Sequence, residues 1–189
     1  MPGAADRADA MMQMTQHRHA PPVGDLVGGP QSWLRHQAAQ RRELVVVGAH
    51  GGAGATTLAV LLQPAWDMGA MRPGRDARQP ALICHGRPLL LACRATPAAA
   101  AAATTAAAAL IRPGAPVAVL AVVSDGWPEP AAATARFRLL EQRVGAVVRV
   151  PFVPAFRLAG DPADVPLPAR ARRALDRIRA AAGRPPHSR

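Results

Sequence analysis

The sequence predicts an α/β fold in which a parallel sheet of about four or five strands lies between two layers of helices. Short apolar runs, such as residues 43–48 and 117–124, have the composition of strands that are buried on both faces. Alanine-rich or helically periodic segments lie between these runs, and such alternation is typical of parallel sheets. The length of 189 residues suits one domain of this kind with tails.

The chain divides into a domain and two tails. Residues 1–30 mix Pro, Gly, Met and His without helical or strand period, so we expect a disordered N-terminal tail. Residues 31–182 are expected to form the domain, and residues 183–189 a second disordered tail. The elements expected within the domain are a helix over 33–42, a strand over 43–48, a helix ending before Pro64, an irregular connection over 65–80, a marginal strand over 81–84, a strand over 88–93, a helix over 97–111, a strand over 117–124, a helix over 131–144, a strand over 146–150 and a helix over 167–182.

Local signals support the individual helices. Ser32 and Thr96 are placed to cap the helices that follow them, and Pro97 occupies a first turn, where a missing N–H costs little. The last helix carries arginines on one face and an apolar stripe on the other. The residues of that stripe are Ala171, Leu175, Ile178 and Ala182.

Composition limits the classes of function. The formal net charge is +11, and all 23 lysine-plus-arginine residues are arginines. This charge indicates an anionic partner or reflects the codon usage of a GC-rich genome. Aromatic residues make up only 3% of the chain, so alanine and valine must build most of the core. The N-terminus lacks a secretory pattern and no run is apolar enough for a membrane span, so we expect a cytoplasmic protein without a transmembrane segment.

Several other chemistries have little support. Cys84 and Cys93 are too few for a disulfide framework and are expected to be free and buried. His17 and His19, and His85 beside Cys84, lack the further ligands that a metal site requires. The sequence contains neither a Gly-x-Ser-x-Gly elbow nor a metalloprotease histidine motif, which removes hydrolases of those types.

A glycine-rich segment follows the first predicted strand. Residues 48–57 read Gly-Ala-His-Gly-Gly-Ala-Gly-Ala-Thr-Thr and lie between that strand and a helix. Such a turn can cradle a phosphate, because its backbone N–H groups converge on an anion and the helix start adds partial positive charge. The alternative is that the glycines only permit a tight turn, with Thr56 and Thr57 capping the helix.

The run Val-Val-Val-Gly-Ala-His-Gly-Gly-Ala-Gly-Ala-Thr-Thr-Leu-Ala resembles the start of the ParA/MinD-like (SIMIBI-type) P-loop NTPases, the group of the partition ATPases. The loop of that group reads Gly-Lys-Gly-Gly-x-Gly-Lys-Thr-Thr. Here Ala49 replaces its first glycine, and His50 and Ala55 replace its two lysines. The resemblance extends over residues 43–154. Small proteins of high-GC bacteria with a similar loop also resemble this chain. The matching positions are Gly51, Gly52, Gly54, Thr56 and Thr57.

The resemblance implies binding of ATP or another nucleotide with Mg²⁺. Backbone groups of residues 51–55 would hold the β-phosphate, Thr56 would ligate Mg²⁺, and Thr57 would lie near the α-phosphate. His50 would be a shorter substitute for a lysine that relatives extend to the partner's nucleotide in a dimer. Without a lysine at Ala55, hydrolysis is expected to be slower by about a hundredfold or more. The nucleotide-binding residues implied are His50, Gly51, Gly52, Ala53, Gly54, Ala55, Thr56 and Thr57.

Acidic residues for a metal site are scarce. Relatives carry acids after their second and third strands, whereas no acid lies between Asp76 and Asp125 in this chain. Asp67 and Asp76 are candidates by elimination, and we infer a trimmed sheet without the acidic strand. Asp125 follows a strand in the region where the family contacts the base, so it is either a base ligand or a plain turn residue.

Three classes of function therefore stay open. The first is a degenerate P-loop module with weak or no hydrolysis, a pseudo-ATPase that binds nucleotide and acts through an unidentified protein partner or a homodimer. The second is an active partition-type ATPase. The third is a basic protein whose arginine-rich segment, residues 168–189, binds nucleic acid nonspecifically or an acidic partner. That segment has no aromatic residue on which bases could stack.

Overall fold

The computed structural model describes residues 43–71, 84 and 86–184. Backbone contacts divide the chain into two units, Met1–His36 and Gln37–Arg189, and every described residue belongs to the second. The predicted tail over 1–30, the helix over 33–42, Asp76 and most of the marginal strand over 81–84 lie outside the described residues.

Among the described residues, five parallel strands form one sheet, in the order β2-β1-β3-β4-β5. The central strand β3 and its neighbour β1 are almost completely buried, because a parallel sheet with helices on both faces has no solvated side. The strands are β1 (Leu44–Gly48), β2 (Ala65–Ala70), β3 (Leu89–Arg94), β4 (Val117–Val123) and β5 (Val147–Val150).

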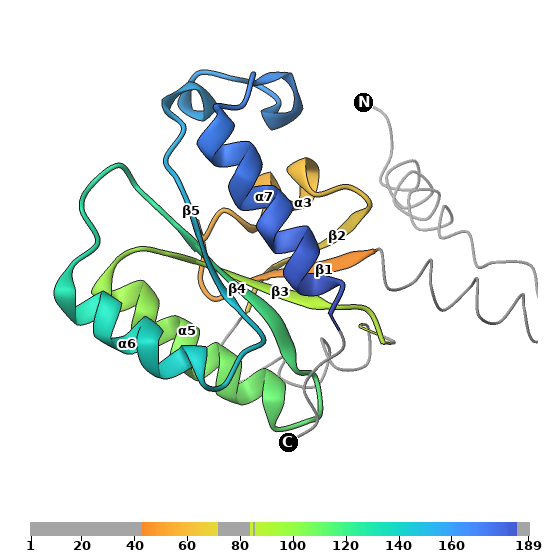
Figure 1. Cartoon of the computed structure of the whole chain (residues 1–189), viewed down its shortest axis with the longest axis vertical. Coiled ribbons are helices and arrows are strands. Elements are labelled where there is room, and N and C mark those ends of the chain that lie inside the picture. Colours follow the sequence, from red (N-terminus) through yellow and green to blue (C-terminus); the bar gives the residue numbers. More distant parts are fainter. Residues whose placement is uncertain (1–42, 72–83, 85, 185–189) are drawn as a thin grey trace, which may run out of the picture. The chain divides into compact units, whose positions relative to one another are not determined.

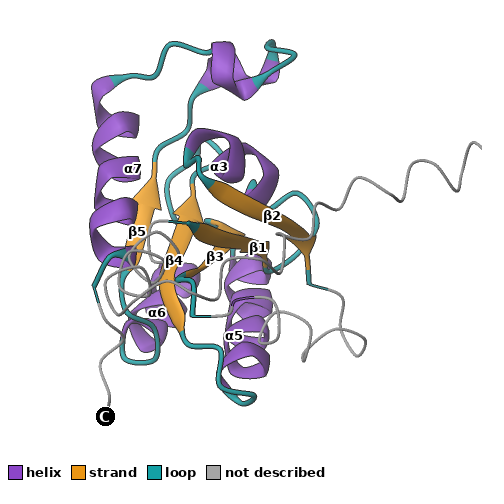
Figure 2. Cartoon of the chain, turned by 90° about the vertical axis from the view of Figure 1, so that its right-hand side faces the viewer, coloured by secondary structure: helices purple, strands orange, loops and turns teal. Residues whose placement is uncertain are grey.

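Helices cover both faces of this sheet (Figure 1). On one face lie α5 (Pro97–Ile111) and α6 (Ala131–Glu141), and on the other lie α3 (Ala55–Leu61) and α7 (Ala169–Ala182). Two short 3₁₀ turns, η1 (Pro154–Arg157) and η2 (Pro162–Asp164), lie between β5 and α7. Figure 2 shows the sheet between its two helical layers. The predicted three-layer parallel α/β fold is confirmed.

The helices follow their sequence signals closely. Ala99 N donates to Thr96 Oγ1 at 3.2 Å, and Pro97 opens α5, as predicted. The stripe of α7 that was predicted to be apolar is buried. Leu175, Ile178 and Ala182 pack against the sheet, whereas Ala171 belongs to a small cluster with Val153 and Val165. The start of α7 shifts from residue 167 to Ala169, after the N-cap Pro168. The predicted helix over 131–144 ends earlier, at Glu141.

One expectation is wrong: the connection predicted to be irregular over 65–80 begins with strand β2. Its sequence, Ala-Trp-Asp-Met-Gly-Ala, has no strand-like alternation, and its pairing with the buried β1 decides its conformation. Trp66 helps to hold this edge strand, because its Nε1 donates to Glu43 Oε2 at 3.2 Å and Arg87 lies 5.0 Å from the ring centroid.

Gly145, just before β5, lies against the backbone of β4. A Cβ at this position would lie 2.5 Å from the carbonyl oxygen of Ala118, and backbone cannot move aside as a flexible side chain does. We therefore expect Gly145→Ala to lower the free energy of unfolding by about 1–3 kcal/mol, as overpacking does. Denaturant titration measures this, with Gly160→Ala as control, since nothing lies within 4 Å of a Cβ there. Equal stability of the two variants would contradict the close contact.

Candidate functional site

The glycine-rich loop connects β1 to α3 at the carboxyl edge of the sheet. Gly52 and Gly54 have φ values of 75° and 86°, a left-handed conformation that side chains other than glycine rarely adopt. Gly54 is also the N-cap of α3. Two of the glycines matched in the sequence are thus required by the backbone of this turn, whatever it binds.

Beneath the loop, the chain is packed with alanines. Ala53 and Ala55 are buried in the core, and a Cβ on Gly48 would lie 3.3 Å and 3.5 Å from their Cβ atoms. Ala55, which stands where the ParA/MinD-like loop that this one resembles has its second lysine, is 8% exposed. This position therefore supplies packing and no positive charge.

His50 folds back on the loop. Its Nδ1 lies 2.8 Å from the carbonyl oxygen of Gly51, and the backbone N–H of Arg94 donates to its Nε2 at 3.3 Å. A carbonyl accepts a proton from Nδ1 and an N–H donates to a lone pair on Nε2, so the two contacts match a ring that donates through Nδ1 and accepts through Nε2. His50 acts here as a bridge between the loop and β3.

Arg94, the last residue of β3, makes a second bridge to the loop. Its Nε donates to the carbonyl oxygen of Gly52 at 2.9 Å. Among the described residues, nothing hydrogen-bonds or ion-pairs with its two terminal nitrogens. A fixed guanidinium with available donors therefore lies beside the loop, on the strand next to the one that leads into it.

Beside the loop is a cavity of about 230 Å³ that is partly open to solvent. Loop and helix residues form one wall, Arg94 and the end of β4 another, and the segment after β5 the third. Arg157 stacks on this third wall, with its guanidinium carbon 4.8 Å from the Phe152 ring centroid. The lining residues are Gly54, Thr57, Leu58, Leu61, Arg94, Val123, Ser124, Val150, Pro151, Phe152, Val153, Phe156 and Arg157.

The structure separates the eight predicted nucleotide-binding residues into four groups. Gly54 and Thr57 line the cavity. His50 is the structural bridge described above. The glycines Gly51 and Gly52 and the predicted metal ligand Thr56 are exposed, while Ala53 and Ala55 are buried under the loop.

Sequence reasoning missed Arg94, Arg157 and the two phenylalanines of the cavity. For Arg94 a signal was available, because a charged residue at the carboxyl end of a buried strand lies at the edge where parallel sheets bind ligands. Arg157 and Phe152 follow the last strand without any local pattern, and only the fold brings them to the loop.

A magnesium site is poorly supplied with ligands. The described residues contain no cluster of three or more His, Cys, Asp or Glu side chains that could hold a metal, and no carboxylate lines the cavity. Asp67 lies within β2, paired with Val46, and its Oδ1 accepts from Gly69 N at 2.8 Å. Asp125 likewise accepts from Trp127 N at 3.1 Å, as a turn residue does. Magnesium coordination normally draws on one or two carboxylates together with phosphates, so these residues do not fit the ion.

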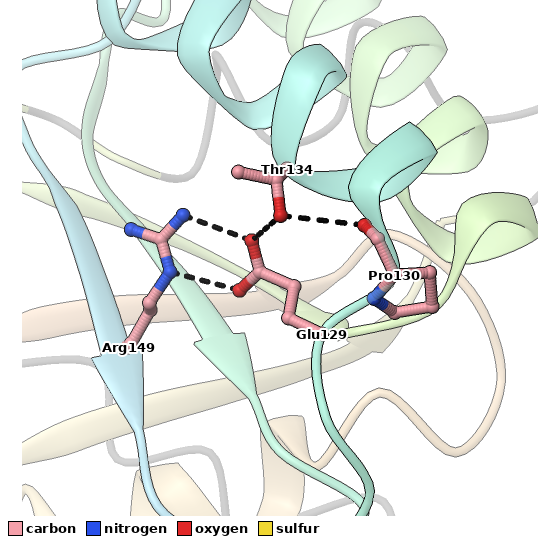
Figure 3. Close-up of polar contacts among 4 residues, drawn as sticks. All are labelled: Glu129, Pro130, Thr134 and Arg149. Atoms are coloured by element: carbon pink, nitrogen blue, oxygen red, sulfur yellow. Dashed lines mark hydrogen bonds and ion pairs between the residues drawn. The ribbon is translucent and has the colours of Figure 1, made fainter.

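A hydrogen-bonded ion pair lies between β5 and the start of α6 (Figure 3). Arg149 donates to both carboxylate oxygens of Glu129, from Nε at 2.8 Å and from Nη2 at 2.9 Å. The Thr134 hydroxyl donates to the same carboxylate at 2.8 Å. The hydrogen bond from Arg149 lowers the pKa of Glu129.

The prediction that Cys84 and Cys93 are free and buried is confirmed. Burial, together with the Glu129 carboxylate, raises the pKa of the Cys93 thiol to about 12.

Comparison of the chain with protein-family models, with characterised proteins and with solved structures gave no match. Within the described residues, no helix has both the length and the apolar character needed to cross a membrane. The resemblance of the loop to the ParA/MinD-like group therefore stays a prediction.

The His50 bridge generates a stability prediction. His50→Ala removes the acceptor of the partly buried Arg94 N–H, and leaving such a donor unpaired costs about 1–3 kcal/mol. We expect that loss in the free energy of unfolding, together with faster proteolysis within residues 49–54. Thr56→Ala is the control, because Thr56 is exposed and its change should stay within about 0.5 kcal/mol. If the two variants were equally stable, His50 would not join the loop to β3.

The Glu129 ion pair generates a pH prediction. The pKa of Glu129 is lower in the folded state than its ordinary value of 4.5. Its contribution to stability is therefore complete above that value and is lost as the pH falls through the lowered pKa. At neutral pH we expect Glu129→Gln to be less stable than wild type by about 0.5–1.5 kcal/mol, and this difference should shrink as the pH falls below about 4.5. Chemical denaturation at several pH values measures it, and a difference independent of pH would refute the assignment.

Proposed function

We propose that this chain is a nucleotide-binding module of the pseudo-ATPase kind, which holds a nucleotide at the cavity beside the glycine-rich loop with weak or no hydrolysis. One observation carries the proposal: loop residues Gly54 and Thr57 share a cavity with two arginines, Arg94 and Arg157. A glycine-rich loop at the carboxyl edge of a parallel sheet is a common place for phosphate groups.

Arg94 supports the phosphate end of the proposed ligand. Guanidinium groups match phosphate oxygens in a bidentate way and remain charged at all physiological pH values. The Nε bond to Gly52 orients the side chain in advance, so little rotamer freedom is lost when a ligand binds. The charge that Ala55 no longer supplies would thus come from the neighbouring strand.

The other end of the cavity supports a base or sugar. Phe152 and Phe156 offer apolar surface, and Arg157 offers a flat cation stacked on one of these rings. The volume of about 230 Å³ is below the roughly 300–1,000 Å³ of pockets that enclose whole ligands. The ligand would accordingly be held at its phosphates and on one face of its base, with the remainder in solvent.

The same residues argue for slow turnover. A divalent ion would depend on the ligand's own phosphates and on water, since neither a carboxylate nor the predicted metal ligand Thr56 lines the cavity. Both ring nitrogens of His50 are engaged with the backbone, so this side chain has no free group to contribute. An active partition-type ATPase is for these reasons the weaker candidate. A cytoplasmic location belongs to the proposal, because nucleoside triphosphates are found there and buried free thiols persist there.

The test is a thermal-shift titration of the full chain with ATP, ADP and GTP, each with and without Mg²⁺. Ligand that binds only the folded state raises Tm, by an amount equivalent to about 2.7 kcal/mol at a hundredfold excess over Kd. Arg94→Gln should weaken nucleotide binding by about tenfold or more, because it removes a charge-assisted hydrogen bond. Thr57→Val, which keeps the side-chain shape, should weaken binding by a smaller factor.

The matched control is Arg138→Gln, an exposed arginine of α6 that does not line the cavity. It removes the same charge and should leave nucleotide affinity unchanged. No rise in Tm with any nucleotide would overturn the proposal, as would equal losses in Arg94→Gln and Arg138→Gln. Phosphate release from ATP at a rate typical of ATPases would overturn the part of the proposal that expects weak or no hydrolysis.

A further inference from the structure

Trp127 lies on a turn between β4 and α6 that is held by hydrogen bonds. Its side chain is 78% exposed, the most exposed tryptophan among the described residues. Its backbone N–H is held by Asp125 Oδ1, and Gly126 N donates to Ser124 Oγ at 3.2 Å. The turn continues with Pro128, Glu129 and Pro130, so a proline stands on each side of Glu129. A large apolar ring is therefore presented to solvent by a segment with little freedom to withdraw it.

Two arginines of α7 reach the same place. Trp127, Arg170 and Arg177 line one open pocket of about 310 Å³ beside the edge strand β5. Arg170 and Arg177 are seven residues apart, which is two helical turns or about 10.5 Å along the axis, so they can contact different groups of an extended ligand. The fold thus supplies the aromatic ring that the arginine-rich segment lacks in its own sequence.

The local charge of this pocket is positive. Its lining includes one carboxylate, Glu129, and that group is neutralised by the bidentate pair with Arg149 drawn in Figure 3. Neither Arg170 nor Arg177 pairs with a carboxylate among the described residues. The pocket combines two available guanidinium groups with an exposed indole.

We propose that this pocket binds single-stranded nucleic acid, with a base stacked on Trp127 and backbone phosphates on Arg170 and Arg177. Sites for single strands join a positive groove that follows the phosphates to aromatic side chains that stack on the bases. A duplex keeps its bases stacked on each other and has none to offer the ring. An acidic peptide would match the charge, but it has no group that requires a stacked indole. This pocket adjoins the proposed nucleotide cavity and shares Ser124, Val150 and Pro151 with it. Trp127, Arg170 and Arg177 line this pocket and not that cavity, so the inference does not depend on the nucleotide site.

The experiment measures fluorescence anisotropy of a labelled oligothymidine of about 12 nucleotides with the full chain at low salt. We expect Trp127→Ala to weaken binding by about 5- to 100-fold, since stacking of one base accounts for such a factor. Trp127→Phe, which keeps a stacking ring, should recover most of that affinity. An abasic strand of equal length should bind wild type about as weakly as the oligothymidine binds Trp127→Ala.

Two double variants test the arginines. Each variant loses two positive charges, so the two variants have the same net charge. Arg170→Gln with Arg177→Gln should weaken binding and reduce the slope of log affinity against log salt by about 1.4, which is the value for two phosphates of a single strand. Arg172→Gln with Arg173→Gln, on the same helix but outside the pocket, should leave the slope unchanged. Melting temperatures check that all variants fold, and Trp127→Ala should retain the nucleotide-dependent rise in Tm.

Four results would overturn the inference. They are no binding of oligothymidine at low salt, an unchanged affinity in Trp127→Ala, equal losses in the two double arginine variants, and a polyglutamate peptide that displaces the oligothymidine and binds more tightly. The last result would identify an acidic polypeptide as the partner of this pocket. Loss of the nucleotide response alone, with oligothymidine binding retained, would refute the proposed function and leave this inference standing.

Discussion

The pairing of β1 with β3 is the constraint on which the rest of this structure depends. Gly48 pairs with Ala92, so both strands reach the carboxyl edge of the sheet together, and Ala49 N continues the ladder by donating to the Ala92 carbonyl at 2.8 Å. His50 and Arg94 then emerge side by side and join loop to strand. A slip of one residue would reverse the faces of β1, whose side chains alternate between the two cores. Hydrophobic burial on both faces therefore fixes the position of the charged group beside the loop.

Small side chains fill much of this core, which changes the interactions that stabilise its helices. The strands contribute branched residues, whereas the buried face of α5 consists of five alanines and Leu110. Alanine buries little apolar area, so each turn of α5 gains less from packing than a leucine-rich helix would. It also has the highest intrinsic helix propensity, and the cap at Thr96 satisfies the first turn. Intrinsic propensity and close approach to the sheet thus replace part of what bulky side chains supply elsewhere. Phe137 is the largest fully buried side chain in the part of the chain that the structure describes.

Local sequence was sufficient where burial was continuous or a cap was explicit. The apolar runs of β1, β3 and β4, the alanine helix after Thr96 and the buried stripe of α7 could all be predicted from neighbours in the chain. β2 could not, because Asp67 and Gly69 disfavour a strand and only pairing with β1 imposes one. For the same reason the two candidate binding surfaces were incomplete in the sequence. Arg94 lies about forty residues along the chain from the loop that it contacts. Trp127 is separated by a similar number of residues from the arginines of α7 that line its pocket. Residues so far apart in the sequence are brought together by the order of the strands.

The loop also separates two requirements that an active P-loop enzyme meets together. Holding a phosphate needs backbone donors and a nearby positive charge, and a guanidinium on the adjacent strand can provide that charge. Breaking a phosphoanhydride bond needs charge that follows the transferring group, a metal ion and a positioned nucleophile. Arg94 is tied to the Gly52 carbonyl through Nε and cannot follow a moving group without losing that bond. An arrangement of this kind favours the ground state of a bound ligand over its transition state, and binding energy used in this way does not accelerate chemistry. What a ligand would change instead is the rigidity of the contact between loop, β3 and the segment after β5.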